Sequence, residues 1–273
     1  MIILIALTIT IVYIWSALIM SKTYNVPLSV INIPDDTISV REGERLVRIE
    51  HCGDCHGLKF TGKVYRKIEY VAQLAGPNIT TIIPGYSNEE LERLIRHGVK
   101  KNGKSVYAMP SAMYYQLKDE SIEKIIAYLR TLKPVLSSPE AAALTYYPLG
   151  RLQIIQDKIK PVAATINHNA PRQFANYDTS QTAFGKYLVM TACSNCHGKD
   201  LKGNASRNIP NLVIASAYNK DQFRHLLKTG EGGLNKKELG LMSEMGKNHL
   251  CYLNDKEINA IYVFLKTLPS QKN

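Results

Sequence analysis

Two short segments of the chain carry the residue types best suited to chemistry. "HCGDCHGLKF" (51–60) and "ACSNCHGKDL" (192–201) each hold two cysteines three positions apart, with a histidine directly after the second. Four of the five cysteines lie in these two segments. Two thiols at this spacing could form a disulfide, a dithiol redox pair or half of a zinc site.

The histidine that follows each cysteine pair selects among these interpretations. A dithiol pair does not need it, and zinc ribbons place their second cysteine pair only about 15–20 residues away. C-x-x-C-H is the attachment signal of c-type haem, in which both thiols add across the haem vinyl groups and the imidazole binds the iron. We therefore predict two covalently bound haems c, one on Cys52, Cys55 and His56 and one on Cys193, Cys196 and His197.

The sequence around the two motifs is repeated. Three pairs of segments match: "GERLVRIEHCGDCHG" (43–57) with "GKYLVMTACSNCHG" (185–198), "GYSNEELERLIRHG" (85–98) with "SAYNKDQFRHLLKTG" (216–230), and "LKDESIEKIIAYLRTLKP" (117–134) with "LNDKEINAIYVFLKTLP" (253–269). In the middle pair a polar N-cap precedes apolar residues at i, i+3 and i+4, and a glycine follows. Each copy therefore predicts three helices: a leading helix, a short amphipathic helix and a closing helix. β-Branched alternation is poor, so we expect no sheet.

This repeat predicts an all-α chain of two tandem domains rather than a solenoid. A proline-bearing linker between them, with a helical stretch at 150–159, is long enough to wrap over a domain surface. The expected boundaries are an anchor at 1–20, a tether at 21–38, a first domain at 39–135, a linker at 136–180 and a second domain at 181–270.

The first twenty residues, "MIILIALTITIVYIWSALIM", carry no charged side chain. As a helix they would be about 30 Å long, which is enough to cross the hydrocarbon core of a bilayer. A cleavable signal would show a basic start, a shorter apolar core and a small-x-small cleavage site. We expect an uncleaved transmembrane anchor, although a cleaved signal is the alternative. The one nearby cation, Lys22, does not fix its orientation.

The formal net charge is +11. A nucleic-acid-binding protein would gather its cations in a stripe, whereas here Lys and Arg are scattered among carboxylates. We therefore expect no nucleic acid as a partner. The charge favours an anionic membrane surface or a redox protein with an acidic docking face.

A haem iron that holds one imidazole has a sixth position, and its ligand separates a carrier from an enzyme. A thioether there closes the iron and raises its potential, while an open position allows peroxide chemistry. For the first haem the candidate is Met109 in "YAMPSAMYYQL", just ahead of the closing helix. Met113 is expected to pack in the core.

For the second haem, "GLMSEMGKNHLCYL" offers two methionines. Met245 precedes Leu253 by eight positions, as Met109 precedes Leu117, so the spacing favours Met245. His249 is a third candidate and would give a bis-histidine site of lower potential. Arg96 is expected on a solvated helix face and Cys251 in a buried position.

With these motifs the chain resembles membrane-anchored dihaem cytochromes c built from two class I cytochrome c domains. It is similar to the cytochrome subunits of bacterial membrane-bound alcohol and gluconate dehydrogenases, which carry three haem domains where this chain has two. The resemblance implies Met109 and Met242 as sixth ligands, and the carbonyls of Pro77 and Pro210 as partners of the haem histidines. It also implies that Gly43 and Gly185 let the leading helix cross the aromatic of the closing helix (Tyr128 and Phe264).

We therefore expect an electron carrier rather than an enzyme, linking a dehydrogenase or a quinol-oxidising complex to a terminal acceptor. Covalent haem attachment occurs on the outer side of bacterial inner membranes, which predicts a single-pass protein with its haem domains in the periplasm. The alternatives are a fixed haem subunit of a dehydrogenase or oxidase complex, and a dihaem peroxidase.

Overall fold

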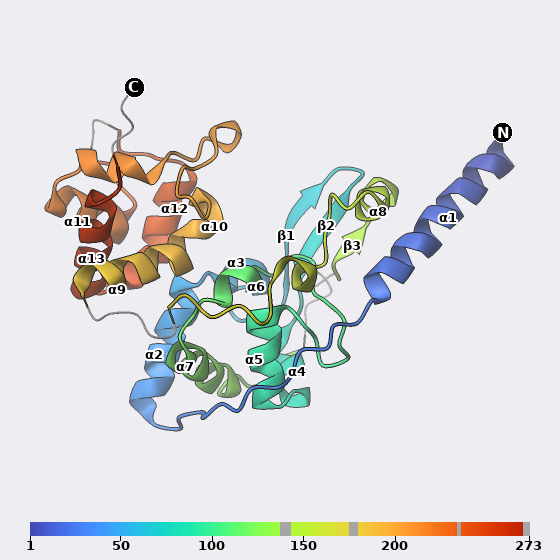
Figure 1. Cartoon of the computed structure of the whole chain (residues 1–273), viewed down its shortest axis with the longest axis horizontal. Coiled ribbons are helices and arrows are strands. Elements are labelled where there is room, and N and C mark those ends of the chain that lie inside the picture. The colour runs from blue at the N-terminus through green and yellow to red at the C-terminus, as the bar shows by residue number, and fades with distance from the viewer. Residues whose placement is uncertain (137–142, 175–179, 234–235, 270–273) are drawn as a thin grey trace. The chain divides into compact units, whose positions relative to one another are not determined.

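A computed structural model describes residues 1–136, 143–174, 180–233 and 236–269 (Figure 1). Helices hold 55% of the residues and strands 8%, so the predicted helical class is confirmed. Two stretches of the predicted linker, 137–142 and 175–179, lie outside the described residues, as does residue 270 at the predicted end of the second domain.

The chain divides into two compact units. The first comprises residues 1–44, 52–115 and 119–170, and the second comprises 45–51, 116–118 and 171–273. Most of the predicted linker that the structure describes therefore belongs to the first unit. Backbone hydrogen bonds tie it there, since the N–H of Val162 donates to the carbonyl of Val106 at 3.0 Å.

Three longer helices frame the first unit: α2 (Thr37–Ile49), which belongs to this unit up to residue 44, α5 (Asn88–His97) and α7 (Asp119–Arg130). Their apolar stripes are buried, as the helical spacing predicts; Leu91 of α5 and Ile122 of α7 are examples. The shorter elements are α3 (Cys52–His56), α4 (Ile79–Ile82), η1 (Ile83–Gly85), α6 (Ser111–Tyr114) and η2 (Val162–Thr165).

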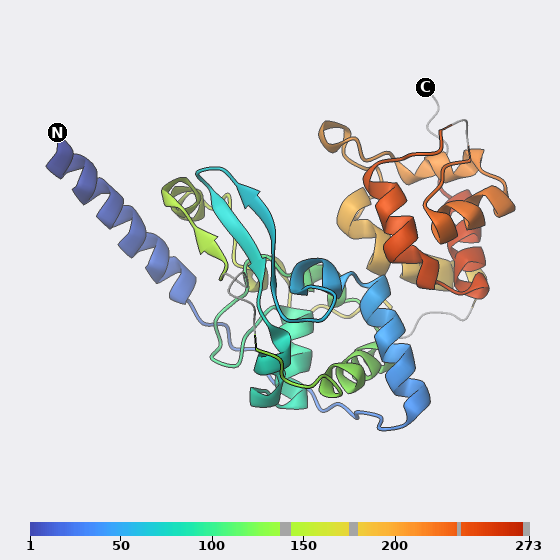
Figure 2. The ribbon, with the colours of Figure 1, turned by 180° about the vertical axis from the view of Figure 1, so that it is seen from behind.

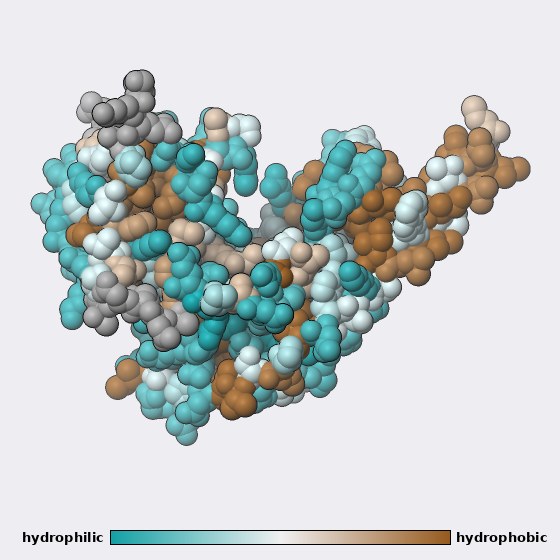
Figure 3. Space-filling model, viewed as in Figure 1, coloured by the Kyte–Doolittle hydropathy of each residue, from teal (hydrophilic) through white to brown (hydrophobic). Residues whose placement is uncertain are grey.

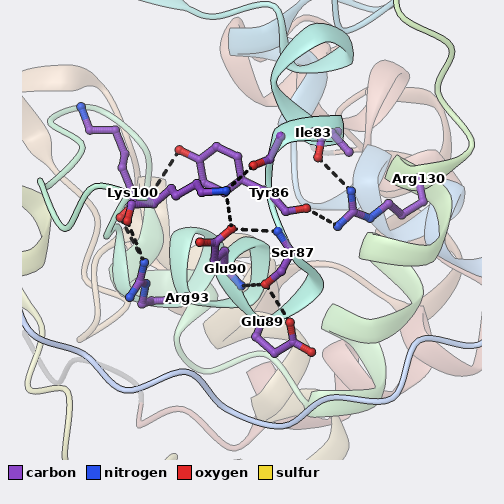
Figure 4. Close-up of polar contacts among 10 residues, drawn as sticks. Ile83, Tyr86, Ser87, Glu89, Glu90, Arg93, Lys100 and Arg130 are labelled. Atoms are coloured by element: carbon purple, nitrogen blue, oxygen red, sulfur yellow. Dashed lines mark hydrogen bonds and ion pairs between the residues drawn. The ribbon is translucent and has the colours of Figure 1, made fainter.

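A polar network fixes the start of α5 (Figure 4). The Ser87 hydroxyl accepts the N–H of Glu90 at 3.2 Å, and the Glu90 carboxylate accepts the N–H of Ser87 at 2.8 Å. This reciprocal cap satisfies two backbone donors that the helix leaves unpaired. Arg130, at the end of α7, donates to the carbonyls of Ile83 and Tyr86 at 2.8 and 2.7 Å. The turn before α5 is thereby held against α7.

The second unit repeats this frame with α9 (Gln181–Leu188), α11 (Lys220–Thr229) and α13 (Asp255–Lys266). Asn219 and Gln222 form the same reciprocal cap at the start of α11. Lys266, at the end of α13, donates to the carbonyl of Ser216 at 2.8 Å, in the role that Arg130 has in the first unit. The shorter elements are η3 (Val189–Cys193, a π-helical turn), α10 (Ser194–His197), η4 (Ala205–Arg207), η5 (Leu212–Ala217), α12 (Leu241–Asn248) and η6 (Leu250–Tyr252).

In both units the leading and closing helices cross at a glycine. A Cβ on Gly43 would lie 1.9 Å from the carbonyl oxygen of Lys124 in α7, and one on Gly185 would lie 2.0 Å from that of Ala260 in α13. No side chain fits at such distances from backbone atoms. The same glycines lie against the Cβ atoms of Tyr128 and Phe264, so the crossing that the resemblance implied is present.

The first unit also contains a small sheet, and our expectation of no sheet was wrong. β1 (Lys63–Ile68) pairs antiparallel with β2 (Ala72–Gly76), and β2 pairs with β3 (Thr145–Tyr146) from the linker. The register shifts between Val64 and Arg66. A bulge of this kind breaks the period of two, which explains why the sequence shows no clean alternation.

The linker helix α8 (Pro148–Ile155) packs beside this sheet and against α1 (Ile2–Ser21). Figures 1 and 2 show α8 next to the hairpin from both sides. α1 is long and apolar enough to cross a membrane by length and composition. The tether that follows it is not loose, because the N–H of Tyr24 donates to the carbonyl of Gly103 at 2.8 Å. Val26 is buried against Val99.

Candidate haem-binding sites

Each C-x-x-C-H motif ends on a short helix, α3 in the first unit and α10 in the second. One helical turn brings the two sulfurs and the imidazole of each motif to the same region of the chain. All five cysteines lie in the described part of the chain, and none forms a disulfide. The four motif thiols are half-buried, so they are present as thiols at the edge of each core.

The imidazoles of both motifs are oriented by a proline carbonyl. Nδ1 of His56 lies 2.9 Å from the carbonyl oxygen of Pro77, and Nδ1 of His197 lies 2.9 Å from that of Pro210. A carbonyl oxygen can only accept, so Nδ1 must carry the proton and donate it. In the neutral ring this leaves the Nε2 lone pair for a metal. These are the contacts that the resemblance implied.

Burial sets the protonation of the motif groups. It lowers the pKa of His56 and of His197, with the hydrogen bond to proline acting in the opposite direction. Both rings are therefore neutral near pH 7, the form that binds iron. Burial likewise raises the pKa of the Cys193 thiol to about 12 and raises that of Cys55.

The turn after each histidine is the same in both units and requires glycine. Gly57 and Gly198 both have φ of +81°, a conformation that side chains disfavour. The carbonyl of His56 then accepts the N–H of Gly62 at 2.9 Å, and the carbonyl of His197 accepts that of Gly203 at 2.8 Å. The segment that carries each proline is thereby brought back to its histidine.

The residues present fit a covalently bound haem in each unit. Two thiols flank a neutral imidazole whose Nδ1 is already hydrogen-bonded, so only Nε2 is presented to a metal. In the first unit Gly76 also lies so close that a Cβ there would be 2.2 Å from the carbonyl oxygen of Cys55. β2 therefore runs directly along the motif, because its last residue has no side chain.

The first candidate sixth ligand lies in a bend. Met109 is half-buried just before α6, and its carbonyl accepts the N–H of Ser111 at 2.9 Å. Met113, by contrast, is 8% exposed within the core, as expected. A half-buried thioether on an irregular loop suits a ligand, while a buried one on a helix suits packing.

The second candidate ligands, Met242 and Met245, lie on α12. They are three positions apart, so they share one face of the helix, and both are half-buried. Their positions leave both in contention. His249, the third candidate, is the C-cap of the same helix.

The sequence did not reveal that Arg96 is a buried cation that holds the segment between Met109 and α7, which we term the ligand segment. Arg96 is 1% exposed, so the expected solvated position was wrong. Its guanidinium pairs with Glu92 at 2.8 Å and with Asp119 at 2.7 Å, and it donates to the carbonyl of Tyr115 at 3.1 Å. Tyr115 lies between Met109 and the closing helix.

The second unit places Lys228 at the position of Arg96. Its ammonium donates to the carbonyls of Cys251, at 2.8 Å, and Leu253, which lie between the methionines and α13. The signal was available in the sequence, since the matched segments carry a cation at this position in both copies. Cys251 itself is half-buried rather than buried.

Comparison with known proteins gives a consistent result. The family model described as Cytochrome c matches residues 40–133 and 182–269. The fructose dehydrogenase cytochrome subunit of Gluconobacter japonicus is 27% identical over 264 residues, which cover 85% of this chain and 53% of that protein.

Two further relatives have related names. The gluconate 2-dehydrogenase cytochrome c subunit of Pantoea cypripedii is 26% identical, covering 84% of this chain and 59% of that protein. The alcohol dehydrogenase (quinone) cytochrome c subunit of Gluconacetobacter polyoxogenes is 25% identical, covering 86% and 57%. The chain therefore spans little more than half the length of these relatives. They are cytochrome subunits of the kind that the sequence resembles, which confirms that prediction.

Proposed function

The chain belongs to the cytochrome c family, and from this premise we propose that it is a dihaem electron carrier. One observation carries the proposal. Two separate C-x-x-C-H motifs each end in an imidazole, half-buried at His56 and buried at His197, whose Nδ1 lies 2.9 Å from a proline carbonyl. A haem on each motif would supply one-electron chemistry, and the protein would set the ligands, their orientation and the exclusion of water.

The roles of the residues follow from their chemistry. The thiols of Cys52 and Cys55, and of Cys193 and Cys196, would form the thioether links. His56 and His197 would bind iron through Nε2, while Pro77 and Pro210 fix each ring by accepting its Nδ1–H. A carbonyl partner of this kind raises the basicity of the ligand and keeps the imidazole from rotating.

We propose Met109 as the sixth ligand of the first haem and Met242 as that of the second, with Met245 as the alternative. Thioether ligands favour the reduced iron and leave no open position for peroxide. The two proposed ligands differ in setting, because Met109 is on a bend and Met242 is on a helix. The thioether of the second haem would therefore come from a helix and that of the first from a loop.

We propose that the carrier takes electrons from a dehydrogenase or a quinol-oxidising complex and passes them to a terminal acceptor of a respiratory chain. The names of the relatives support a dehydrogenase as donor. They equally support a second candidate, a fixed cytochrome subunit of such a complex. Extraction of the membrane with mild detergent distinguishes the two. A fixed subunit would be purified together with catalytic subunits, whereas a separate carrier would be purified alone.

We place the haem units in the periplasm, with α1 in the inner membrane as a single span. The length and apolar composition of α1 support the span, and extracytoplasmic haem attachment supports the side. Anchoring would hold the carrier near its partners and raise their effective concentration. The excess of cations supports partners with acidic docking faces.

Spectroscopy of the purified full-length protein tests this proposal. A pyridine haemochrome assay should find two covalently bound haems per chain, and the sulfur-to-iron band of the oxidised protein should account for both. Met109→Leu and Met242→Leu should each remove about half of that band, because each haem has one thioether ligand. Met113→Leu is the matched control and should leave it intact.

Three outcomes decide between the alternatives. If Met245→Leu rather than Met242→Leu removes the band, Met245 is the ligand. A high-spin haem in the unmodified protein would favour a peroxidase over a carrier. One haem per chain, or none, would refute the proposal.

A further inference from the structure

The first unit has an additional surface that its electron-carrying role does not explain. The sheet and α8 have no counterpart among the described residues of the second unit. They lie beside α1, the proposed membrane anchor, and this inference rests on that anchor. We term residues 66–72 of the hairpin and 146–160 of the linker the platform.

The platform is joined to α1 by specific contacts. Ser16 is completely buried although it lies on an otherwise exposed apolar helix. Arg151 of α8 donates to the Ser16 hydroxyl at 3.4 Å and to the Met20 sulfur at 3.2 Å, and its guanidinium lies 5.1 Å from the ring centre of Tyr13. Ile19 and Met20 pack on the cluster formed by Ala72, Tyr146 and Ile154.

These contacts fix the depth of α8 if α1 crosses a bilayer. Ser16 precedes the helix end at Ser21 by five residues, which at the rise of an α-helix is about 7 Å. Because Arg151 contacts Tyr13, Ser16 and Met20, α8 lies alongside the last two turns of α1, around the level of Ser16. Helices that bind membrane surfaces are buried about 5–10 Å into the boundary between headgroups and acyl chains. α8 would thus lie in that layer.

The side chains of the platform suit the same layer. Leu149 is 45% and Leu152 37% exposed on α8, and Tyr70 is 72% exposed at the hairpin tip. Figure 3 shows hydrophobic surface on α1 continuing onto the adjoining part of the first unit. Tyr13 and Trp15 on α1 are also exposed, and such aromatic residues gather at membrane interfaces.

The charges of the platform favour anionic lipid. Its cations are Arg66, Lys67, Arg151, Lys158 and Lys160, and its carboxylates are Glu69 and Asp157. Lys160 pairs with Asp157 at 2.6 Å, which offsets one cation. The remaining excess of positive charge would meet the negative surface of a phospholipid layer.

We propose that the platform binds the surface of an anionic phospholipid bilayer, with α8 as an interfacial helix next to α1. The first unit is then fixed on the membrane rather than tethered to it. The loop of Met109 is linked to this arrangement, because the ring of Tyr107 lies 6.0 Å from that of Tyr146. The first haem would consequently face membrane-bound donors in a defined orientation.

A photoreactive phospholipid tests this proposal on the full-length haem protein. Nanodiscs of phosphatidylcholine with and without phosphatidylglycerol would carry the probe, and labelled peptides would be identified by mass spectrometry. We expect labelling of both α1 and α8, with α8 labelled several-fold more strongly when phosphatidylglycerol is present. The variant Leu149→Glu/Leu152→Glu should lose the label on α8 and keep that on α1. Ile214→Glu, at a site 46% exposed in the second unit, is the matched control and should change nothing.

The outcomes separate the platform from the anchor. Label on α1 with none on α8 would overturn the platform and leave the anchor intact, whereas no label on α1 would overturn the anchor itself. Equal labelling of α8 without phosphatidylglycerol would overturn the preference for anionic lipid. If native membranes gave label on α1 but not on α8, the surface would belong to a protein partner. An unchanged sulfur-to-iron band in each variant would show that the haem units remain folded.

Discussion

Pro77 follows its haem histidine by 21 positions in the first unit, and Pro210 follows its own by 13 in the second. Both nevertheless lie 2.9 Å from the histidine Nδ1. The additional residues between histidine and proline in the first unit form the β1–β2 hairpin, whose last residue, Gly76, lies against Cys55. The contact between histidine and proline is therefore the same in both units, although the loops that join the two residues differ in length.

The two units also enter their motifs differently. α2 ends before Cys52 with His51 at a φ of +58°, whereas α9 continues through a π-helical turn at Val189–Cys193. The second unit has one residue fewer in this segment. Each route leads into a short helix that ends at the motif histidine. The crossing glycine and the contact between histidine and proline are thus the same in both units, while the connections between them differ.

The largest loss of stability is expected at the two glycines where the leading and closing helices cross. Gly43→Ala and Gly185→Ala should each lower the free energy of unfolding by about 3 kcal/mol or more, because the added Cβ meets a backbone carbonyl of the closing helix that no side-chain motion can clear. Urea unfolding followed by circular dichroism measures this. Gly85→Ala is the control, since nothing lies within 4 Å of its Cβ. A loss below about 1 kcal/mol at either crossing would show that the helices can separate there.

Arg96 and Lys228 occupy matched positions, but Arg96 pairs with carboxylates whereas Lys228 donates to backbone carbonyls. Arg96→Met should cost about 3 kcal/mol, because it leaves the buried carboxylate of Glu92 without its cation. Lys228→Met should cost only about 1 kcal/mol, since it removes hydrogen bonds to two backbone carbonyls. The urea midpoints of both variants measure the difference.

The same two variants separate support of the fold from support of the ligand segment. Each should shift the redox potential or the sulfur-to-iron band of the haem in its own unit and leave the other haem unchanged. Arg93→Met is the control in the first unit, because it lies on the same helix and donates to carbonyls before Met109 rather than after it. Equal costs for Arg96→Met and Lys228→Met would contradict the distinction.

Features that occur in both units could be predicted from the sequence, whereas those of one unit could not. Aligning the chain with itself paired Gly43 with Gly185, and the family resemblance implied that both lie where the helices cross. The hairpin at 63–76 had no counterpart to align with, and its bulge removed the alternation that marks a strand. The packing of α8 on α1 joins segments more than a hundred positions apart, which periodicity within either segment cannot reveal.

Buried charge was the other point at which the sequence misled. Arg96 lies four positions after Glu92 on an amphipathic helix, and such a pair is usually solvated. Only the approach of Asp119 and the carbonyl of Tyr115 from elsewhere in the unit makes its burial favourable. The proposed thioether ligands have the same difficulty, because neighbouring methionines such as Met242 and Met245 lie on one face of the same helix and the sequence does not separate them.

The smallest expected effect concerns a pair that the first unit alone possesses. Nδ1 of His168, in the linker, lies 2.9 Å from Nδ1 of His97 on α5, and the Tyr115 hydroxyl donates to the carbonyl of His168 at 3.3 Å. One Nδ1 must donate and the other accept, so at least one ring is neutral. The second unit has Thr229 at the position of His97. We therefore expect acid to weaken the packing of the linker on the first unit, and we expect no corresponding effect at Thr229.

Burial lowers the pKa of His168 below its ordinary value, with a backbone hydrogen bond to Ala163 acting in the opposite direction. The unfolded chain then binds a proton that the folded chain does not. Its contribution to stability is complete above the ordinary pKa of about 6.5 and is lost as the pH falls through the lowered value. Urea midpoints measured across this range should decline less steeply for His168→Gln than for the unmodified chain. His225→Gln is the control, because that exposed imidazole contacts only Glu231 among the described ion pairs. An unchanged slope for His168→Gln would mean that another group titrates and that the imidazole pair does not make the linker sensitive to acid.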